Sequence, residues 1–411
     1  MNKQPDNSSA QFGPVLDTRD PIVEHTKDSR GATILQVLPA LGSGGGVERG
    51  TIEMVRAIAE SGGRALVASA GGGQVHEVNR AGGTHFDLPM SSKNPVIIYN
   101  NIRRLVDLIE EEMVDLVHVR SRAPAWSGFY AARQTGLPLI TTFHGTYNTE
   151  NFLKRAYNSV MTRGDRVIAI SEFIGEHVHR YYGVPISRLR IIHRGVDLLR
   201  FNRANVSAER IVELASAWRI TEGYPVIMLP GRLTRWKGQV EFIEAVARLN
   251  RRDIRCLIVG SDQGRSNYRK NLESLVKNHD LGEVVRIVDH CSDMPAAYML
   301  SDVVVSASTD PEAFGRVIIE AQALGRPVIA SDHGGARETV LKDQTGWLVP
   351  PGDVDALSLA LGKVLELDEE SRTSLSDAAI TNVVENFSRE KMCSQTLAVY
   401  DEVLHAPNLI D

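Results

Sequence analysis

Two glutamates, Glu312 and Glu320, flank a Phe-Gly turn ahead of a predicted helix in the stretch DPEAFGRVIIEAQALGRPVIA. If the helix begins near Gly315, Glu320 lies about 7 to 8 Å along its axis, at roughly 1.5 Å per residue. The free N–H groups of Phe314, Gly315 and Arg316 fall between the acids, and exposed amides at a helix N-terminus bind phosphate. A nucleotide sugar has the same order of parts, because its diphosphate lies between the ribose and the sugar. We therefore expect Glu320 to bind the ribose hydroxyls and Glu312 the sugar hydroxyls. The alternative is that Glu312 merely complements the helix dipole and Glu320 is solvated.

Two basic residues, Arg232 and Lys237, directly follow the predicted strand YPVIMLPG in the segment GRLTRWKG. This segment does not have the GxxxxGK[ST] spacing of a Walker A loop. Ligands of open α/β sheets bind beyond the carboxyl ends of the strands, so these cations are placed to hold a diphosphate. A solvated pair of surface charges is the alternative.

A glycine-rich loop, LGSGGGVERG at residues 41–50, lies between a predicted strand and a predicted helix. Its glycines allow a ligand to approach the backbone, and the helix N-terminus favours an anion. The loop does not fit the dinucleotide fingerprint GxGxxG, because Val47 stands where the third glycine is required. A flexible turn without a ligand is the alternative. Gly334 and Gly335, in ASDHGGARETV, precede another predicted helix and would add a second group of amides.

Asp353 and Asp355, in PPGDVDALS, have the DxD spacing of residues that hold a metal on nucleotide sugars. They open a predicted helix after two prolines, so we expect helix capping and predict no metal site. The three cysteines, Cys256, Cys291 and Cys393, are widely spaced and form no CxxC pair. This spacing disfavours structural zinc and a secreted disulfide framework.

The composition is that of a soluble globular protein, with 43% hydrophobic and 24% charged residues. A length of 411 residues exceeds one hydrophobic core and predicts two domains with a cleft between them. The formal net charge of -5 argues against a general nucleic-acid binder.

Residues 1–30 are polar and lack the apolar segment of a secretory signal, so we expect a mostly disordered tail. No window approaches about 18 consecutive apolar residues, which leaves peripheral membrane contact and a cytoplasmic location as the expectation.

The elements that must position these residues alternate between short β-branched runs and helical stretches, which predicts an α/β fold with parallel sheets. A first series of buried strands is predicted at TILQVLPA, ALVASA, VDLVHV, PLITTF, DRVIAIS and RLRIIHR. A second series is predicted at YPVIMLPG, RCLIVG, VVRIVD, DVVVSAS, RPVIAS and GWLVPP. We therefore expect two Rossmann-like domains facing across a cleft. The expected boundaries are a tail at 1–30, a first domain at 31–200, a linker at 201–224, a second domain at 225–388 and a last helical segment at 389–411 that crosses back to the first domain.

The ordered set of motifs resembles that of the retaining glycosyltransferases of family 4, also called group 1, which have the two-domain GT-B fold. The pattern E-x7-E appears in EAFGRVIIE, and the other similar segments are GRLTRWKG, RPVIASDHGG, TGWLVPPGD, RVIAIS and HRGVD. The resemblance implies transfer of a sugar from a nucleoside-diphosphate donor to a hydroxyl acceptor, with the anomeric configuration retained. It also implies an enzyme that needs no metal and no cofactor beyond the donor substrate, which binds in the second domain while the first binds the acceptor.

The resemblance assigns catalytic roles to four positions. Arg232 and Lys237 match residues that stabilise the departing diphosphate in place of a metal. Glu312 matches the acid that contacts the donor sugar. His144, at the end of PLITTF, matches a histidine that faces the donor sugar near the reaction centre. No residue stands out as a covalent nucleophile, which agrees with the front-face mechanism proposed for this family, in which the departing phosphate helps to deprotonate the acceptor.

Further positions match residues that bind the rest of the donor. Glu320 matches the acid that binds ribose. The amide-bearing turn of the family matches Phe314, Gly315 and Arg316. The glycine loop beside the phosphates matches Gly45 and Gly46. After VVRIV the family usually has glycine, whereas this chain has Asp289. That loop commonly lies against the nucleobase, so the sequence does not identify the base.

A mixture of cations and aromatic residues in the first domain suggests where the acceptor binds. Such a mixture suits an anionic glycolipid or the surface of an anionic membrane, and ordinary solvated helix faces are the alternative. For bacterial members of the family this indicates assembly of envelope polysaccharide or lipopolysaccharide, at the inner face of the plasma membrane. The residues are Arg120, Arg122, Trp126, Phe129, Tyr130, Arg133, Lys154, Arg155, Tyr157, Arg163 and Arg166.

Two other classes of function remain open from the sequence. A sugar-nucleotide epimerase or hydrolase of the same fold would turn over the donor without an acceptor. A non-catalytic protein that binds sugar nucleotides is the other, and the intact set of Arg232, Lys237, Glu312 and Glu320 disfavours it. A dinucleotide oxidoreductase is disfavoured because GxGxxG is missing.

Overall fold

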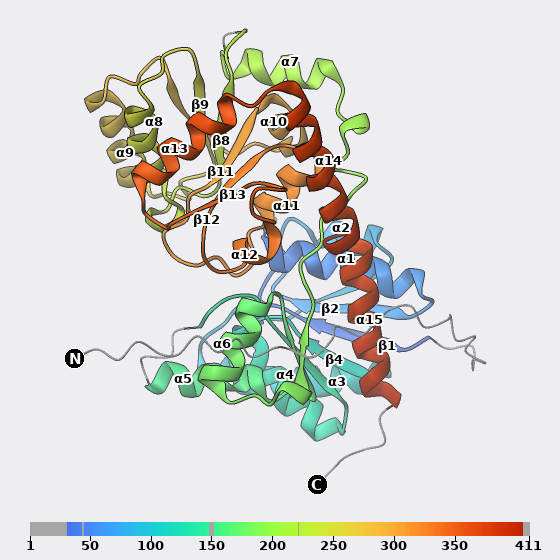
Figure 1. Ribbon diagram of the computed structural model, residues 1–411. Coiled ribbons are helices and arrows are strands. Elements are labelled where there is room, and N and C mark those ends of the chain that lie inside the picture. Colours follow the sequence, from blue (N-terminus) through green and yellow to red (C-terminus); the bar gives the residue numbers. More distant parts are fainter. Residues whose placement is uncertain (1–30, 43–44, 148–151, 221, 406–411) are drawn as a thin grey trace.

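The computed structural model describes residues 31–42, 45–147, 152–220 and 222–405. The tail predicted at 1–30 and the end of the last predicted segment, 406–411, lie outside the described residues. Two parallel β-sheets, each flanked by helices, form two lobes that lie one above the other in Figure 1. This arrangement confirms the two-domain α/β fold that the alternating strand and helix patterns predict.

The first sheet has the strand order β3-β2-β1-β4-β5-β6-β7 with parallel neighbours. Both of its faces are buried, because Leu35 packs in one apolar cluster and the adjacent Ile34 in another. The order reverses between β1 and β4, so the loops after these strands border the place where ligands of such sheets bind. The strands are β1 (Thr33–Val37), β2 (Arg64–Ser69), β3 (Thr84–Asp87), β4 (Leu116–Val119), β5 (Leu139–Phe143), β6 (Arg166–Ala169) and β7 (Leu189–Ile191).

Most helices of the first lobe pack an apolar face on this sheet. In α1, for example, Ile52, Val55 and Ile58 recur at three-residue spacing and are buried. The Ser171 hydroxyl accepts the N–H of Ile174 and caps the N-terminus of α6. The helices are α1 (Gly46–Glu60), α2 (Val75–Arg80), α3 (Pro95–Glu111), α4 (Arg122–Thr135), α5 (Phe152–Asn158) and α6 (Glu172–Tyr182), with 3₁₀ turns at Ser159–Thr162 and Ile186–Arg188.

The second sheet has the order β10-β9-β8-β11-β12-β13, again with parallel neighbours. Its order reverses between β8 and β11, so the loops after these two strands border the second ligand position. The strands are β8 (Val226–Pro230), β9 (Arg255–Val259), β10 (Val285–Val288), β11 (Val303–Ser306), β12 (Val328–Ser331) and β13 (Trp347–Val349). The helices are α8 (Gln239–Leu249), α9 (Ser266–Asn278), α10 (Met294–Leu300), α11 (Arg316–Ala323), α12 (Ala336–Thr339) and α13 (Val354–Leu365).

One strand of the first sheet was not predicted. The segment THFD forms β3 at the edge of the sheet, where none of its four residues is fully buried. It therefore lacks the continuous apolar run that identifies the other strands in the sequence. None of the described helices is long and apolar enough to cross a membrane.

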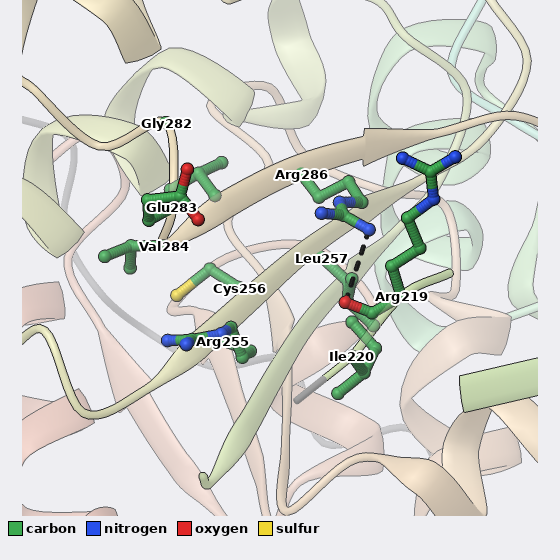
Figure 2. Close-up of a pocket in the computed structure, with 10 residues that line it drawn as sticks. Arg219, Ile220, Arg255, Cys256, Leu257, Gly282, Glu283, Val284 and Arg286 are labelled. Atoms are coloured by element: carbon green, nitrogen blue, oxygen red, sulfur yellow. Dashed lines mark hydrogen bonds between the residues drawn. The ribbon is translucent and has the colours of Figure 1, made fainter. Parts of the chain in front are cut away.

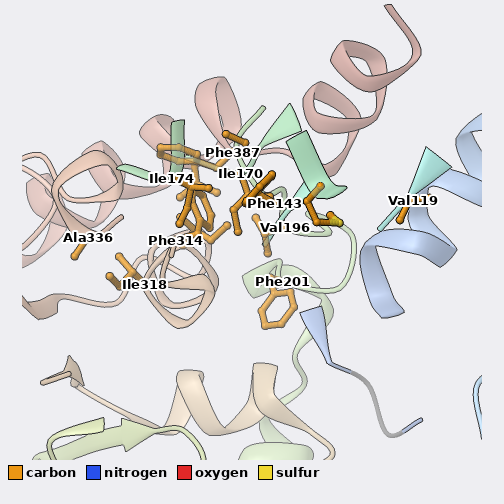
Figure 3. Packing of buried hydrophobic residues seen from close by; sticks show 14 of the residues in the cluster. Val119, Phe143, Ile170, Ile174, Val196, Phe201, Phe314, Ile318, Ala336 and Phe387 are labelled. Carbon is orange, nitrogen blue, oxygen red and sulfur yellow. The ribbon is translucent and has the colours of Figure 1, made fainter. Parts of the chain in front are cut away.

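The two lobes are joined by connecting segments and by a shared apolar cluster. A 3₁₀ turn (Arg203–Asn205) and α7 (Ala208–Ala217) precede the second sheet, and α14 (Glu369–Asn386) follows it. The last helix, α15 (Arg389–His405), returns to the first lobe, where it runs beside α1 in Figure 1. Figure 3 shows side chains of both lobes in one cluster, including Phe143 of β5 and Phe314 of the second lobe.

Candidate active site

Lys237 and Glu312 lie together at the carboxyl ends of β8 and β11. Lys237 Nζ is 2.7 Å from Glu312 Oε1, and both side chains are mostly buried. The hydroxyls of Ser306 and Ser308 also donate to this carboxylate oxygen. Burial alone would raise the pKa of Glu312, but the charge of Lys237 and the two serine hydroxyls hold it below its ordinary value. The carboxylate is therefore ionised at neutral pH and can accept hydrogen bonds from hydroxyl groups.

Gly238 explains why the Lys237 loop lies against the end of β11. This glycine has φ of +73° and ends the 3₁₀ turn Arg235–Lys237. A Cβ at Gly238 would lie 1.8 Å from the carbonyl oxygen of Ala307, so only glycine fits. The N–H of Thr309 also donates to the carbonyl of Trp236. These contacts tie the two loops together and bring Lys237 onto Glu312.

The turn between Glu312 and Glu320 presents backbone amides, as the sequence suggests. Helix α11 begins at Arg316, after Gly315 with φ of +86°. No described residue accepts a hydrogen bond from the N–H of Phe314, Gly315 or Arg316. The ring of Phe314 is buried between the lobes, against His193 and Phe387. The ring anchors the turn, while its three amides have no partner within the described chain.

A second loop, residues 332–335, holds this turn from the other side. The N–H of Gly335 donates to the carbonyl of Glu312 at 2.9 Å. A Cβ at Gly334 would lie 2.4 Å from that same oxygen, and a Cβ at Gly335 would lie 2.4 Å from Cα of Phe314. His333 belongs to this loop, and both of its ring nitrogens are buried without a partner among the described residues. The two glycines thus permit close packing, and His333, which the sequence did not single out, adds unpaired nitrogens beside them.

Glu320 is buried and contacts residues from both lobes. Its Oε2 accepts a hydrogen bond from the hydroxyl of Tyr298 at 3.0 Å. Its Oε1 lies 3.7 Å from Arg49 of the first lobe and 3.5 Å from Arg316. Burial and the Glu320 charge raise the pKa of Tyr298 well above its ordinary value, so the phenol stays protonated and donates. The alternative that Glu320 is a solvated surface charge is therefore wrong, since only 8% of the residue is exposed.

His144 follows β5 and contacts Arg194, which follows β7. Arg194 Nη2 lies 2.9 Å from His144 Nδ1. The other ring nitrogen, Nε2, is buried and has no hydrogen-bond partner among the described residues. Burial, followed by the charges of Arg194 and Arg120, lowers the pKa of His144 well below its ordinary value. The histidine is therefore neutral, and one of its nitrogens is available to a ligand.

The glycine loop lies where α1 meets the second lobe. Gly45 precedes α1, and its N–H donates to the Glu48 carboxylate at 2.5 Å. A Cβ at Gly46 would lie 3.9 Å from Cδ of Arg316, so the loop faces the α11 turn across the lobe boundary. The amide of Gly45 is already bonded within the capping arrangement, which limits its part in binding an anion.

The remaining predicted residues differ in their surroundings. Arg232 is exposed, and no described residue pairs with its guanidinium. Asp353 caps α13 by accepting the N–H of Ala356 at 2.9 Å, and Asp355 pairs with Arg248. Among the described residues, no group of three or more His, Cys, Asp or Glu side chains is arranged to hold a metal ion. Asp289, the departure from the family pattern, is exposed and pairs with Arg269 at 2.8 Å.

The predicted basic and aromatic surface of the first lobe is smaller than expected. Arg120 is buried and donates to Gln36, so it belongs to no surface. Arg166 is partly exposed, and its charge is paired with Glu402 of α15. The prediction is wrong for Arg120, because the sequence shows its charge but not the buried partner that binds it. The predicted residues that are exposed are Arg122, Tyr130, Arg133, Lys154, Arg155, Tyr157 and Arg163. Three of them lie on α5, where the apolar Phe152 and Leu153 are exposed beside them.

The lobe boundary contains polar contacts that the sequence did not reveal. Glu338 of the second lobe accepts the N–H groups of Glu172 and Phe173, at the start of α6, and lies 2.8 Å from His193 Nε2. The Ser171 hydroxyl donates to the carbonyl of Ala313 at 2.6 Å. A carboxylate of one lobe thus caps a helix of the other. Arg49 in GGGVERG and Arg194 in HRGVD stand within motifs that the sequence made visible, whereas nothing local marks Glu338.

A small cavity lies at the opposite edge of the second sheet. It opens beside Arg255 and Arg286, at the amino ends of β9 and β10, and Figure 2 shows Arg286 directed at the backbone carbonyl of Arg219. Its volume of about 10 Å³ has room for one water molecule at most. It is therefore unrelated to the residues at the carboxyl ends of the strands.

Comparison with known proteins agrees with this geometry. Residues 44–200 match the glycosyltransferase family 4 pattern, and residues 213–382 match the glycosyl transferases group 1 pattern. The solved structure of a glycosyltransferase from Rickettsia africae is 38% identical, with a TM-score of 0.85, and the alignment covers 92% of this chain and 99% of that chain. The chain belongs to the group 1 glycosyltransferases of family 4, and it has their two-domain GT-B fold.

Two further proteins resemble the chain more distantly. The structure of Anabaena HepE in complex with UDP-glucose is 23% identical with a TM-score of 0.78, over 90% of this chain and 99% of that chain, and supports the fold alone. The D-inositol 3-phosphate glycosyltransferase of Xylanimonas cellulosilytica is 29% identical over 286 residues, which are 66% of this chain and 67% of that protein. The aligned part thus spans about two thirds of such curated relatives.

Proposed function

We propose that the protein transfers a sugar from a nucleoside-diphosphate sugar to a hydroxyl acceptor, with retention of configuration and without a metal ion. The observation that carries the proposal is the Lys237–Glu312 pair, 2.7 Å long, at the carboxyl ends of two neighbouring strands. The amides of residues 314–316, which have no partner among the described residues, lie next to it. The Lys237 cation and these amides suit a diphosphate, and the ionised Glu312 carboxylate suits the hydroxyl groups of an attached sugar.

The donor would lie along the turn that Glu312 and Glu320 flank. Lys237 and the exposed Arg232 would neutralise the negative charge that develops on the departing diphosphate. The Glu312 carboxylate would accept hydrogen bonds from the sugar, and Glu320 from the ribose. The complex of Anabaena HepE with UDP-glucose supports a donor of this chemical class for the fold.

The proposed reaction exchanges one bond at the anomeric carbon of the donor. The bond from this carbon to the diphosphate oxygen breaks, and the electron pair leaves with the diphosphate. The bond to the acceptor oxygen forms on the same face of the ring, which retains the configuration. The acceptor proton passes to the departing phosphate oxygen, so neither a covalent nucleophile nor a protein base is needed.

The surface around α5 supports a membrane-associated acceptor. Phe152 and Leu153 are 79% and 74% exposed, and they adjoin Lys154 and Arg155. Exposed apolar residues beside cations are typical of proteins that bind the interface of anionic membranes. We therefore extend the proposal to a glycolipid or polysaccharide precursor of the cell envelope, reached from the inner face of the plasma membrane.

Flotation with anionic liposomes tests this extension. The protein should float with the liposomes, and Lys154→Glu combined with Arg155→Glu should abolish flotation without loss of folding. A matched charge reversal on the other lobe, Lys270→Glu with Lys277→Glu, should leave flotation unchanged. Absence of binding by the unaltered protein would show that the acceptor is not reached at a membrane surface.

The transferase proposal is tested by thermal-shift screening with UDP-, GDP- and ADP-sugars, followed by donor turnover with and without lipid extract. A transferase should be stabilised by one donor class and should turn it over only when extract is present. Turnover without any acceptor would indicate an epimerase or hydrolase instead. Stabilisation without turnover would indicate a binding protein, and stabilisation only by NAD or NADP would overturn the proposal.

A further inference from the structure

The contact between Arg194 and His144 determines which ring nitrogen of the histidine carries hydrogen. Arg194 Nη2 lies 2.9 Å from His144 Nδ1. A guanidinium has donors and no acceptor, so Nδ1 must be the accepting, unprotonated nitrogen. The neutral ring then carries its hydrogen on Nε2. That atom is buried and has no hydrogen-bond partner among the described residues.

We propose that Arg194 is a positioning residue that fixes His144 as a neutral Nε2–H donor, which binds an oxygen atom of the sugar donor and does not act as a base. A buried donor without a partner is costly, so its presence in a native protein requires an explanation, and a role at the reaction centre provides one. The identity of that ligand rests on the proposed function. The placement of the hydrogen does not, because it follows from the contact with Arg194.

This arrangement prevents His144 from acting as a general base. A base needs an unprotonated nitrogen that faces the proton to be removed. In His144 the unprotonated nitrogen faces Arg194, and the other nitrogen already carries hydrogen. The assignment agrees with a reaction in which the departing phosphate, and no side chain, accepts the proton of the acceptor hydroxyl.

The groups around the ring also oppose a second proton. They are Arg194 from the loop after β7, and Arg120 and His118 from β4 and the loop that follows it. The backbone of Arg120 acts in the opposite direction and favours a proton, but burial outweighs it. The net effect lowers the pKa of His144 well below its ordinary value. The ring therefore offers one N–H and no positive charge.

Gly50 of α1 makes room for the guanidinium that orients His144. A Cβ at Gly50 would lie 2.3 Å from Arg194 Nη1 and 3.3 Å from Arg120 Nη2. Burial, and then the charges of Arg120 and Arg316, lower the pKa of Arg194 to about 9, so it remains protonated at neutral pH. Arg120 is itself held by Gln36 at 2.8 Å. Two buried cations thus share the space that the missing side chain leaves, and one of them is directed at His144.

Long-range 1H–15N spectra of the full-length protein with labelled histidine test the assignment, with His144→Gln identifying the signal. The unaltered ring should stay neutral with hydrogen on Nε2 between about pH 6 and 8. In Arg194→Met it should become a mixture of tautomers and titrate nearer its ordinary pKa of 6.5. We expect kcat to fall about 10- to 100-fold, by analogy with loss of the partner that orients a metal-ligating histidine, with a smaller change in KM.

Two further variants separate orientation from folding. Arg194→Lys supplies a donor to Nδ1 and should recover part of both the tautomer and kcat. Gly50→Ala retains Arg194 but displaces its guanidinium, so it should reproduce the mixed tautomers in a helix that alanine itself favours. Arg326→Met, which removes a half-buried arginine from the second lobe, should leave the His144 signal unchanged.

The outcomes are distinct from those that test the transferase proposal. A charged ring or an Nδ1–H tautomer in the unaltered protein would overturn the inference, as would an Arg194→Met ring that matches the unaltered one in a variant that keeps full kcat. A protein that transfers no sugar but shows the Nε2–H tautomer would instead overturn the proposed function. The tautomer is read from spectra, so it is decided in either case.

Discussion

Lys237 and Glu312 form a mostly buried ion pair, 2.7 Å long, between loops that are 75 residues apart in the chain. Neither loop would hold its charged side chain alone, because a buried charge without a partner is strongly disfavoured. The pair thus couples the group expected to stabilise the leaving diphosphate to the group expected to contact the sugar. Each residue is placed by the other before any donor binds.

Removal of either charge should therefore affect the chemical step. Glu312→Gln or Lys237→Ala should lower kcat at least about 100-fold, the scale for loss of one transition-state stabiliser. The double variant should lose less than the product of the two single effects, because the residues act as a unit. Arg251→Ala, which breaks the exposed pair with Asp253 on the same lobe, serves as the control and should retain full turnover. Steady-state kinetics with circular dichroism checks the result, and unchanged rates would show that the roles are misassigned.

The acidic side of the pH–rate profile should report Glu312. Its folded pKa is below the ordinary 4.5, so activity that needs the carboxylate is complete above that value and is lost as pH falls through the lowered pKa. In Lys237→Met, burial continues to disfavour the carboxylate without the compensating charge, and the acidic limb should move to higher pH. The residual kcat/KM of the variant, measured against pH, checks the shift. A limb that stays in place would mean that another group controls it.

Glu338 should contribute to both stability and lobe closure. Glu338→Ala removes the acceptor for two amides of α6 and the partner of His193. Loss of such a helix cap costs about 0.5 to 2 kcal/mol, so the free energy of unfolding should fall by this amount. The donor KM should also rise, because the lobes lose a polar contact. Urea unfolding and donor titration measure the two effects, with the exposed Glu110→Ala as the control, and a variant as stable as the control would contradict the capping role.

The buried hydroxyl of Tyr400 should stabilise the first lobe from the far end of the chain. It lies 2.7 Å from His118 Nδ1, while His118 Nε2 lies 2.7 Å from the Thr142 hydroxyl. Tyr400→Phe leaves a buried ring nitrogen without a partner, which costs about 1 to 3 kcal/mol. Urea unfolding should detect the loss. Tyr181→Phe, at a tyrosine that is 44% exposed, should be neutral; equal stability of the two variants would show that the His118 contact contributes nothing.

The sequence predicted the sheets better than the contacts between them. Continuous apolar runs identify buried parallel strands, whereas the half-exposed edge strand β3 has no such run. The turn at Glu312 and the loop at Lys237 were recognisable because they follow strands directly. Their ion pair was not, since it depends on Gly238 packing against Ala307 at the end of another strand.

The partners of charged residues were the least predictable feature. Arg120 looked like a surface cation, but Gln36 binds it inside the fold, and the charge of the partly exposed Arg166 is paired with Glu402. Arg194 stood in a motif used for recognition, yet its contact with His144 requires two strand ends that are 50 residues apart in the chain. Such pairings are set by packing, and local sequence carries no signal for them.

The return of α15 to the first lobe has a consequence for synthesis of the chain. Val399, Tyr400 and Val403 lie in one apolar cluster with Ile34 and Ile140 of the first sheet. A ribosome that has released the whole of that sheet has not yet made the helix that covers it. The nascent first lobe must therefore wait, with an apolar face uncovered, until the second lobe and then α15 have been translated. Of the two lobes, the one that is translated earlier is therefore completed later.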